Sequence, residues 1–387
     1  MSEQARRPRL AIVIPTLGGG GAEKVTTDLA RFLRKGWDIR VFLTKAENDD
    51  GTYAPAFEEM GIPVVRLPSF RFLSTARKAL PLRRGIVAMD PDVVLSVLTA
   101  TNAVVSFALR GTGIPIVLNE HNNLRVAFRE RMKHPKLFNI LTGMAYRSSR
   151  TKASIVVSKA VGDMILEDYP RARAEIVAVH NGLDVAALEK AAGEELEGFP
   201  VPEGTPSVVA VGRFQPIKNF PLLMRALARG GERCRKAHLL LLGKGDEEKA
   251  LRECAASLGI ADRVHFLGFR SNPHAWVARA DVFAMSSDSE GFPCALAEAM
   301  FTNGHCVSTD CPAGPSEIIV PGESGLLVPV GDEAALASAL ERMLSDGELR
   351  ERCARNAKTW ALENTLEHQA RAYDAVLRAA AGLDRTE

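Results

Sequence analysis

Arg213 and Lys218 are two cations, five residues apart, that directly follow a short apolar segment at 207–212. In open α/β sheets, ligands bind outside the carboxyl ends of the strands, where such residues would lie. An arginine can donate two hydrogen bonds to phosphate oxygens, and a lysine adds a point charge. We predict that this pair neutralises a diphosphate, the alternative being two exposed surface cations.

The segment 289–300, Ser-Glu-Gly-Phe-Pro-Cys-Ala-Leu-Ala-Glu-Ala-Met, contains a predicted helix start. Pro293 suits the first helical position, so Gly291 and Phe292 are expected in the loop that enters the helix. The N–H groups of a first helical turn have no partner within the helix and can bind anions. We therefore expect a diphosphate at this turn, in contact with Gly291, Phe292, Cys294, Ala295 and Leu296.

Two glutamates flank this helix start. Glu290 precedes it and Glu298 lies about 1.5 turns beyond Pro293, a separation of ~10 Å or more that is too wide for the ~5.5 Å carboxylate pair of a retaining glycosidase. Separate roles fit better, with one carboxylate on sugar hydroxyls and the other on a ribose. For Glu298, a solvated helix face is the alternative.

Gly18–Gly21 follows an apolar segment at 10–15 and opens a predicted helix. Glycine lets backbone N–H groups approach a ligand closely at the positive end of a helix. The run is not the dinucleotide-binding fingerprint, because Glu23 stands where a third glycine is needed, and no G-x-x-x-x-G-K-[ST] loop occurs. By themselves these glycines are weak candidates for phosphate contact: Gly19, Gly20 and Gly21.

His121 belongs to the polar segment Asn119–Asn123, which follows a predicted strand at 114–119. A polar cluster at such a strand end would face the ligand. The imidazole could bind a sugar hydroxyl or stabilise developing charge, and a structural role is the alternative.

Asp90-Pro91-Asp92 matches the Asp-x-Asp pattern of metal-dependent sugar transferases. It precedes the strand expected at 93–98, however, and would therefore lie at the amino end, away from the ligand face. We interpret it as a turn and expect no metal site.

Short apolar segments alternate with helical patterns along the whole chain. They lie at 10–15, 39–44, 63–67, 93–98, 114–119, 153–158 and 176–180, and the rhythm restarts at 207–212, 237–242, 264–267, 282–285, 306–309 and 325–328. Buried strands that alternate with helices predict parallel sheets covered on both faces. A chain of 387 residues is long enough for two such domains. We predict an α/β fold of two doubly wound, Rossmann-like domains facing a central cleft, with the acidic, Pro- and Gly-containing segment 193–206 as the best linker candidate.

Positive charge is concentrated in the first half of the chain. Residues 1–185 carry 27 Lys and Arg against 18 Asp and Glu, whereas the remainder carries 22 against 29. The cations gather in two stretches, 66–84 and 125–152. They form either a solvated surface or one that docks on anionic lipid or a phosphorylated acceptor. No nucleic-acid-binding motif accompanies them, so nucleic acid is not an expected partner.

Export and membrane insertion are not expected from this sequence. No apolar run approaches the ~18–20 residues that cross a bilayer, and the polar start lacks the pattern of a signal peptide. The six cysteines show no metal-binding spacing and are expected to be reduced thiols. We expect a cytoplasmic protein, with peripheral contact to the inner face of the cell membrane if the basic stretches bind lipid.

Taken together, these segments resemble the retaining glycosyltransferases of family 4 from Leu10 to about Leu340. In this order and spacing the matching motifs are highly specific. They are 289–300, Thr-Asp-Cys-Pro-Ala-Gly-Pro-Ser-Glu-Ile at 309–318, Gly-Leu-Leu-Val-Pro at 325–329, Gly-Gly-Ala-Glu at 20–23, His-Asn-Gly-Leu-Asp at 180–184 and Gly-Arg…Lys-Asn at 212–219.

The resemblance implies the GT-B fold. It would comprise an N-terminal acceptor-binding domain (1–185), a C-terminal nucleotide-sugar-binding domain (186–365) and a final helix (366–387) that packs back on the N-terminal domain.

The family also implies roles for single residues. Arg213 and Lys218 would neutralise the diphosphate. Glu290, with the backbone of Gly291 and Phe292, would hold the donor sugar, and Glu298 would bind the ribose. The Gly19–Gly21 loop would close over the phosphates, His121 would contact the donor sugar, and Phe269 and Arg270 would lie beside the base.

Two positions depart from the family pattern. Cys306 stands where proline is usual, and Asp288 is an additional acid close enough to Glu290 to alter the sugar pocket.

The implied reaction is attack of an acceptor hydroxyl on the anomeric carbon of a nucleotide-sugar, with retention and without a metal or other cofactor. A UDP-sugar carrying a hexose or N-acetylhexosamine is preferred over GDP-mannose. The acceptor would be a saccharide or a lipid-linked saccharide in cell-envelope polysaccharide or lipopolysaccharide assembly. Two alternatives stay open, a nucleotide-sugar epimerase of the same fold and a non-catalytic nucleotide-sugar sensor.

Overall fold

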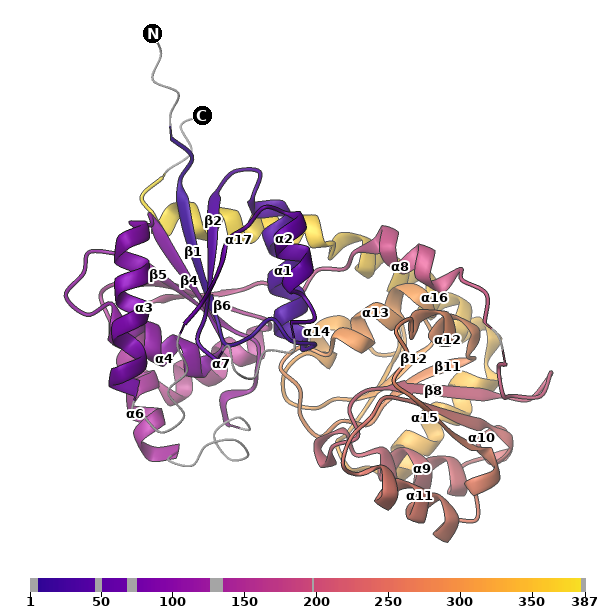
Figure 1. Cartoon of the computed structure of the whole chain (residues 1–387). Coiled ribbons are helices and arrows are strands. Elements are labelled where there is room, and N and C mark those ends of the chain that lie inside the picture. The colour runs from indigo at the N-terminus through magenta and orange to yellow at the C-terminus, as the bar shows by residue number, and fades with distance from the viewer. Residues whose placement is uncertain (1–5, 46–50, 68–74, 126–134, 197, 384–387) are drawn as a thin grey trace. The chain divides into compact units, whose positions relative to one another are not determined.

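The computed structural model describes residues 6–45, 51–67, 75–125, 135–196 and 198–383, and the side chains of 75–78 and 135–137 are outside that description. The chain forms two compact units (Figure 1). The first comprises Met1–Asn181 and Leu366–Glu387, and the second comprises Gly182–Thr365. The first segment of unit 1 therefore ends at Asn181, not at residue 185, and the final helix belongs to the same unit.

A seven-stranded sheet forms the centre of the first unit, in the order β3-β2-β1-β4-β5-β6-β7. All neighbouring strands are parallel. Most residues of the five inner strands are buried because helices cover both faces, which explains the near-continuous Val, Ile and Leu of these segments, whereas the edge strands β3 and β7 are partly exposed. The strands are β1 (Arg9–Ile14), β2 (Asp38–Leu43), β3 (Val64–Arg66), β4 (Val93–Val97), β5 (Ile116–Glu120), β6 (Thr151–Val156) and β7 (Glu175–Ala178).

Helices of the first unit lie on both faces of this sheet (Figure 1). They are α1 (Gly21–Leu33), α2 (Ala54–Glu59), α3 (Thr75–Met89), α4 (Thr99–Ala108), α6 (Pro135–Arg147), α7 (Lys159–Asp168) and α17 (Leu366–Ala380). α3 packs on α4, α4 packs on α6, and α17 packs on α1. α17 contributes Tyr373 and Leu377 to the main core of the unit. The indole of Trp37 also donates a hydrogen bond of 2.6 Å to Asp374, which ties α17 to the loop before β2.

A six-stranded sheet forms the centre of the second unit, in the order β10-β9-β8-β11-β12-β13. Its strands, all parallel, are β8 (Ser207–Val211), β9 (His238–Leu242), β10 (Val264–Gly268), β11 (Val282–Met285), β12 (Cys306–Thr309) and β13 (Leu326–Val328). Its helices are α8 (Val185–Ala192), η2 (Pro216–Lys218), α9 (Phe220–Arg229), α10 (Glu232–Lys236), α11 (Glu248–Ser257), η3 (Ala261–Arg263), α12 (His274–Arg279), α13 (Cys294–Thr302), α14 (Pro315–Ile318), α15 (Glu333–Ser345) and α16 (Gly347–Glu363). The prediction of two doubly wound parallel sheets is confirmed.

The linker prediction at 193–206 is wrong. That segment joins α8 to β8 inside the second unit, because α8 already packs against α12 and α13 there. The chain instead crosses between the units at 181–182 and 365–366. At this crossing the N–H of Leu183 donates to the carbonyl of Asn364 at 2.9 Å, so the two crossing segments are bonded to each other. Glycine and proline mark a surface loop here, and only packing distinguishes such a loop from a boundary.

Strand order defines where ligands are expected in each unit. The order reverses between β1 and β4 in the first sheet and between β8 and β11 in the second. Open parallel sheets bind ligands outside the carboxyl ends of the strands at such a switch point. Most candidate residues follow strands that form or adjoin these two switch points, whereas Phe269 and Arg270 follow β10 at the edge of the second sheet.

Candidate active site

Lys218 and Glu290 meet at the carboxyl edge of the second sheet. Lys218 lies in η2 after β8, and Glu290 lies in the loop between β11 and α13. The ammonium nitrogen is 2.6 Å from Oε1 of the carboxylate, and the two side chains are 24% and 13% exposed. Ser287 donates a second hydrogen bond, of 2.7 Å, to the same oxygen. The structure therefore joins in one ion pair two residues for which the sequence predicts separate roles.

The backbone around Lys218 is held by the loop that carries Glu290. The hydroxyl of Ser286 donates to the carbonyl of Lys218 at 2.9 Å. Asp288 bonds this segment twice, through its N–H to Ile217 and through its carboxylate, which accepts from the Asn219 amide at 2.8 Å. Asn219 is in the left-handed conformation with φ of 45°, which asparagine tolerates better than most residues. Asp288, the acid that departs from the family pattern, thus holds the segment that carries Lys218 in place.

Arg213 is exposed and directly follows Gly212 in the chain. The aliphatic part of the Lys218 side chain lies beside Gly212. A Cβ atom on Gly212 would be 3.5 Å from Cε of Lys218, so the two segments are in contact. In the described part of the chain, no ion pair involves Arg213. This edge of the sheet therefore presents one unpaired guanidinium beside a paired ammonium.

A glycine loop after β9 supports the same edge, and the sequence analysis missed it. A Cβ atom on Gly245 would lie 2.2 Å from the carbonyl oxygen of Phe214, so only glycine allows this backbone approach. Between Gly243 and Gly245, the exposed Lys244 places its ammonium 5.9 Å from the ring centroid of Phe269. The sequence feature that indicates this loop is the Gly-Lys-Gly run at 243–245, directly after the strand predicted at 237–242.

The helix start of α13 differs in detail from the prediction. The helix begins at Cys294, and Pro293 is the residue before it. The N–H of Cys294 is bonded to the carbonyl of Phe292 at 3.0 Å and is not free for a ligand. Within the described residues, the N–H groups of Ala295 and Leu296 have no acceptor. The anion-binding potential of this turn therefore lies in these two groups.

The side chains of Phe292 and Leu296 are buried in the second unit, 7% and 0% exposed. Only their backbone atoms remain as candidate ligand contacts. Gly314 explains how this turn is held, because a Cβ atom there would be 2.3 Å from Cδ of Pro293. The loop after β12 therefore packs directly on the Gly291–Pro293 turn, and Glu298 follows on α13 with a half-buried side chain.

Phe269 and Arg270 follow β10 at the same carboxyl edge. Phe269 is 69% exposed, which is unusual for a phenylalanine and leaves its ring open for stacking. The guanidinium of Arg270 lies 5.2 Å from the ring centroid of Trp276. The geometry therefore offers an exposed aromatic ring, that of Phe269, beside the ammonium of Lys244, whereas Arg270 lies against Trp276.

In the first unit, Gly19–Gly21 leads from β1 into α1. The carboxylate of Glu23 folds back over Gly20, where a Cβ atom would lie 2.2 Å from Oε2, and it accepts a hydrogen bond of 3.1 Å from Thr16. Gly19 and Gly21 are exposed. Glu23, the last residue of the Gly-Gly-Ala-Glu motif, thus closes one side of this loop.

His121 follows β5 on the same edge of the first sheet and is held by Asn119. The Nε2 atom of His121 is 2.7 Å from Oδ1 of Asn119. The Asn119 amide donates to the Tyr373 hydroxyl at 2.9 Å and to the carbonyl of Ile155 at 3.2 Å. Because Oδ1 can only accept, Nε2 carries the proton and Nδ1 keeps a lone pair. Burial lowers the pKa of His121 to about 4, so the ring is neutral at pH 7.

Glu120 is the other ionisable residue of this segment and is fully buried. It accepts hydrogen bonds from Thr99 (2.6 Å), Asn102 (2.8 Å) and Tyr146 (3.0 Å). Burial raises the pKa of its carboxyl to about 7, against the lowering effect of these bonds. It therefore links β5 to α4 and α6 and is not available to a ligand.

The Asp-x-Asp sequence is a turn at the amino end of β4. The N–H of Arg9 donates to the Asp92 carboxylate at 2.6 Å, and Asp90 has a positive φ of 50°. Among the described residues, no group of three or more His, Cys, Asp and Glu side chains could hold a metal ion. All six cysteine thiols are free. In the same part of the chain, no helix combines the length and apolar character that crossing a membrane requires.

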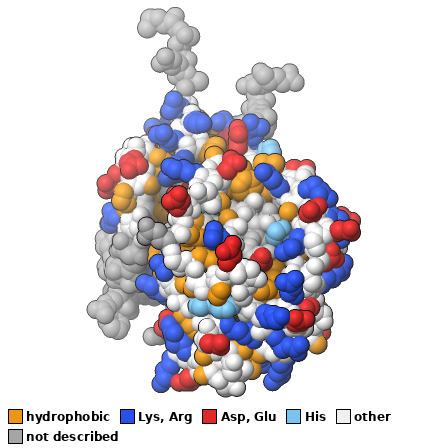
Figure 2. Space-filling view, turned by 90° about the vertical axis from the view of Figure 1, so that its right-hand side faces the viewer, with side chains coloured by type: hydrophobic (Ala, Val, Ile, Leu, Met, Phe, Trp, Pro, Cys, Tyr) orange, Lys and Arg blue, Asp and Glu red, His pale blue; other side chains and the backbone are white. Residues whose placement is uncertain are grey.

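One face of the molecule shows charges of both signs. On the face shown in Figure 2, Lys and Arg side chains are interspersed with Asp and Glu. The basic stretches at 66–84 and 125–152 fall in part on 68–74 and 126–134, which lie outside the described residues.

Comparison with known families covers both units. Residues 19–187 match the family described as Glycosyltransferase Family 4, and residues 193–360 match Glycosyl transferases group 1. With the two parallel sheets, these matches define a glycosyltransferase of the GT-B type. The chain belongs to the glycosyl transferases of group 1, with an N-terminal half of the family 4 type.

Two of the similar proteins carry names from lipid-linked saccharide and lipopolysaccharide synthesis. The Campylobacter jejuni enzyme N-acetylgalactosamine-N,N'-diacetylbacillosaminyl-diphospho-undecaprenol 4-alpha-N-acetylgalactosaminyltransferase is 27% identical over 361 residues, which cover 91% of this chain and 94% of the relative. The lipopolysaccharide core biosynthesis glycosyltransferase LpsE of Rhizobium meliloti is 36% identical over 153 residues, which cover 40% and 44% of the two chains.

Solved structures share the fold over nearly the whole chain. Anabaena HepE in complex with UDP matches with a TM-score of 0.81 at 22% identity, covering 96% of this chain and all of that one. The lipopolysaccharide outer core galactosyltransferase WaaB matches with a TM-score of 0.76 at 20% identity, covering 96% and 99%.

Proposed function

We propose that this glycosyltransferase moves a hexose or N-acetylhexosamine from a UDP-sugar to a saccharide or lipid-linked saccharide, with retention and without a metal ion. The observation that carries the proposal is the Lys218–Glu290 pair, 2.6 Å long, at the carboxyl edge of the second sheet. Arg213 lies beside it, and two unpaired N–H groups open α13. Cations and helix N–H groups are the donors that hold a diphosphate.

The charges at this edge suit a diphosphate that becomes more negative during the reaction. Lys218 has three N–H donors and uses one on Glu290, which leaves two for phosphate oxygens. Arg213 adds a full charge, and the N–H groups of Ala295 and Leu296 add the partial charge of a helix N-terminus. Such preorganised donors stabilise a leaving phosphate without a divalent ion.

In the proposed step, an acceptor hydroxyl oxygen bonds to the anomeric carbon as the bond from that carbon to the β-phosphate oxygen breaks. The hydroxyl proton moves to the departing phosphate oxygen, so UDP leaves and the glycoside keeps its anomeric configuration. Glu290 would bind hydroxyls of the donor sugar, since its second oxygen, Oε2, is not used by Lys218 or Ser287. Neutral His121 would accept a hydrogen bond from a sugar hydroxyl at Nδ1.

The donor and acceptor classes are supported by the relatives. The Campylobacter jejuni enzyme is named for transfer of N-acetylgalactosamine to a diphospho-undecaprenol-linked saccharide, and HepE is solved with UDP. The open ring of Phe269 would stack on a base. We propose a polyprenyl-diphosphate-linked or lipopolysaccharide-type acceptor on this basis.

The test is a panel of UDP- and GDP-sugars, each incubated with and without lipid-linked acceptors in excess EDTA, with released nucleotide and glycoside product measured separately. Nucleotide release that depends on acceptor, from a UDP-hexose or UDP-N-acetylhexosamine, is the expected result. An epimerised donor without acceptor, binding without any product, or strict dependence on Mg²⁺ or Mn²⁺ would each overturn the proposal. NMR of the product's anomeric proton decides between retention and inversion.

A further inference from the structure

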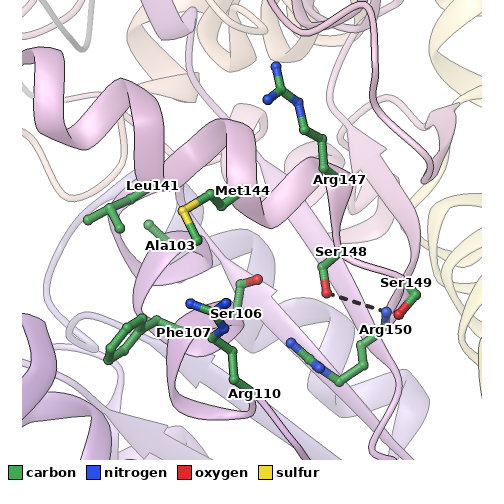
Figure 3. A pocket seen from close by; sticks show the side chains of 10 residues that line it. All are labelled: Ala103, Ser106, Phe107, Arg110, Leu141, Met144, Arg147, Ser148, Ser149 and Arg150. Carbon is green, nitrogen blue, oxygen red and sulfur yellow. Dashed lines mark hydrogen bonds between the residues drawn. The ribbon is translucent and has the colours of Figure 1, made fainter.

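A cavity of about 310 Å³ lies in the first unit between α4 and α6 (Figure 3). Arg110 follows α4 and Arg150 precedes β6, so the cavity is at the amino edge of the sheet. The carbonyl of Arg150 accepts from the N–H of Ile116, the first residue of β5, at 2.8 Å. His121 lies beyond the other end of β5, roughly 16 Å away at ~3.3 Å per residue. The cavity is therefore separate from the candidate active site.

Among the described residues, no acidic side chain compensates the positive charge in this cavity. Figure 3 shows the side chains of Arg110 and Arg150 extending into the same space, whereas Arg147 extends away from them. Among the residues that line the cavity, none is acidic. Burial, with repulsion from Arg110 and Arg83, lowers the pKa of Arg150. Two guanidinium groups held together in this way favour a bound anion.

One nitrogen of Arg150 has no hydrogen-bond partner among the described residues. The Nε atom of Arg150 is buried, and no described residue accepts a hydrogen bond from it. Leaving such a donor unsatisfied costs about 1–3 kcal/mol, and more for a charged group. Arg83 illustrates the contrast, because its guanidinium donates to the carbonyls of Ala108 and Arg110 at 2.9 and 2.6 Å. The end of the Arg150 side chain, unlike the buried Nε, extends into the open space in Figure 3, and its terminal nitrogens are the atoms that an oxyanion in the cavity would contact.

The opposite wall of the cavity is apolar and continues onto an exposed surface. Leu141 and Met144 of α6 line it, with Phe107 of α4. Met144 is 41% exposed and Ile140, one turn earlier, is 62% exposed. Residues four apart on a helix share a face, so α6 presents an apolar stripe to solvent directly beside the arginines. A free phosphate or a nucleotide would leave this stripe uncovered, but an amphiphile would not.

We propose that this cavity binds the phosphate head group of an anionic membrane lipid. Arg110 and Arg150 contact the phosphate, while Ile140 and Met144 enter the interfacial layer of the bilayer. Cations beside an apolar helix face are the combination that binds anionic membrane surfaces. The assignment goes beyond the proposed transfer reaction and does not depend on it.

The experiment is sedimentation of the full chain with vesicles of phosphatidylcholine, with or without phosphatidylglycerol. We expect binding only with phosphatidylglycerol, reduced at least tenfold by Arg110→Gln and Arg150→Gln. Arg150→Lys should also bind less, because it keeps the positive charge but loses the paired N–H donors of the guanidinium. Met144→Gln should weaken binding as well. Arg31→Gln, an exposed cation of α1, is the control and should have no effect. Thermal unfolding verifies that each variant is folded.

Arg147 separates a built site from diffuse attraction to charge. It lies at the rim of the same cavity but extends away, so Arg147→Gln should reduce binding far less than Arg150→Gln. Equal losses for these two variants would overturn the proposal, as would equal binding to both kinds of vesicle. Inorganic phosphate that protects the wild type from thermal unfolding as well as the lipid does would identify a free-phosphate site and overturn the lipid assignment.

Discussion

The ammonium of Lys218 and the carboxylate of Glu290 are 2.6 Å apart, although the residues are 72 positions apart in the chain. An exposed pair of the same length, Lys236 with Glu232, lies on α10 one helical turn apart. The first pair is largely shielded from water and joins two loops of the sheet, whereas the second lies on one helix and is solvated. Removing one partner of a shielded ion pair is costly, whereas removing one partner of a solvated pair has little effect. Substitutions in these two pairs can therefore be compared directly.

Lys218→Ala and Glu290→Ala should each lower the transfer rate by roughly a hundred- to thousandfold, the loss typical when one transition-state donor is removed. Lys236→Ala, the matched control, should leave the rate unchanged. Initial rates of nucleotide release, with circular dichroism for folding, provide the measurement. Rates within twofold of the wild type for either site variant would show that the reaction occurs elsewhere.

Gly245→Ala should displace the segment that carries Arg213 and Lys218, although Gly245 lies in a different loop. The new Cβ atom would lie 2.2 Å from the backbone oxygen of Phe214, which cannot move without displacing the Gly212–Phe214 segment. We expect a loss of stability of about 1–3 kcal/mol and weaker UDP binding. Gly347→Ala is the control, since nothing lies within 4 Å of its Cβ position. Denaturant titration and UDP titration measure the two effects, and equal behaviour of the variants would contradict the packing argument.

Asn119 should act as a positioning residue for His121. Asn119→Ala removes the acceptor for Nε2, so the imidazole loses its orientation, and we expect kcat to fall nearly as far as in His121→Ala. The double variant should be no slower than His121→Ala, because the effects of residues that act as one unit are not additive. Additive losses would show that Asn119 acts independently. Tyr373→Phe should have a smaller effect on kcat, since Asn119 keeps its bond to Ile155.

Glu120 predicts a specific dependence of stability on pH. Its pKa is about 7 in the folded chain against 4.5 as the ordinary value, so the folded state retains a proton that the unfolded state releases. Its contribution is fully present below pH 4.5 and is lost as the pH rises to 7, by about 3 kcal/mol in total. The free energy of unfolding of Glu120→Gln minus that of the wild type should therefore increase with pH across this window. A constant difference would mean that the carboxyl titrates normally. His121, with its lowered pKa, acts in the opposite direction, and the comparison cancels its contribution.

Local sequence determined most of the architecture. Each apolar segment predicted as a strand is one, from β1 at Arg9–Ile14 to β13 at Leu326–Val328, because strands buried on both faces need continuous apolar side chains. The residues that follow β8 and β11 were also identifiable as ligand candidates, since parallel strands bring their carboxyl ends to one edge. These inferences need only the order of residues along the chain.

Tertiary packing decided what the pattern leaves open. The crossing between units lies at 181–182 and 365–366, although the segment 193–206 has the linker composition, because α8 packs within the second unit. Residues distant in sequence are joined by the ion pair of Lys218 with Glu290, by the hydrogen bond of Asp288 with Asn219 and by the hydrogen bond of Asn119 with Tyr373. Such contacts, and the burial that shifts the pKa values of Glu120 and His121, exist only once separate elements are packed together. Sequence spacing therefore named many of the candidate residues, but the folded chain determined their partners and charge states.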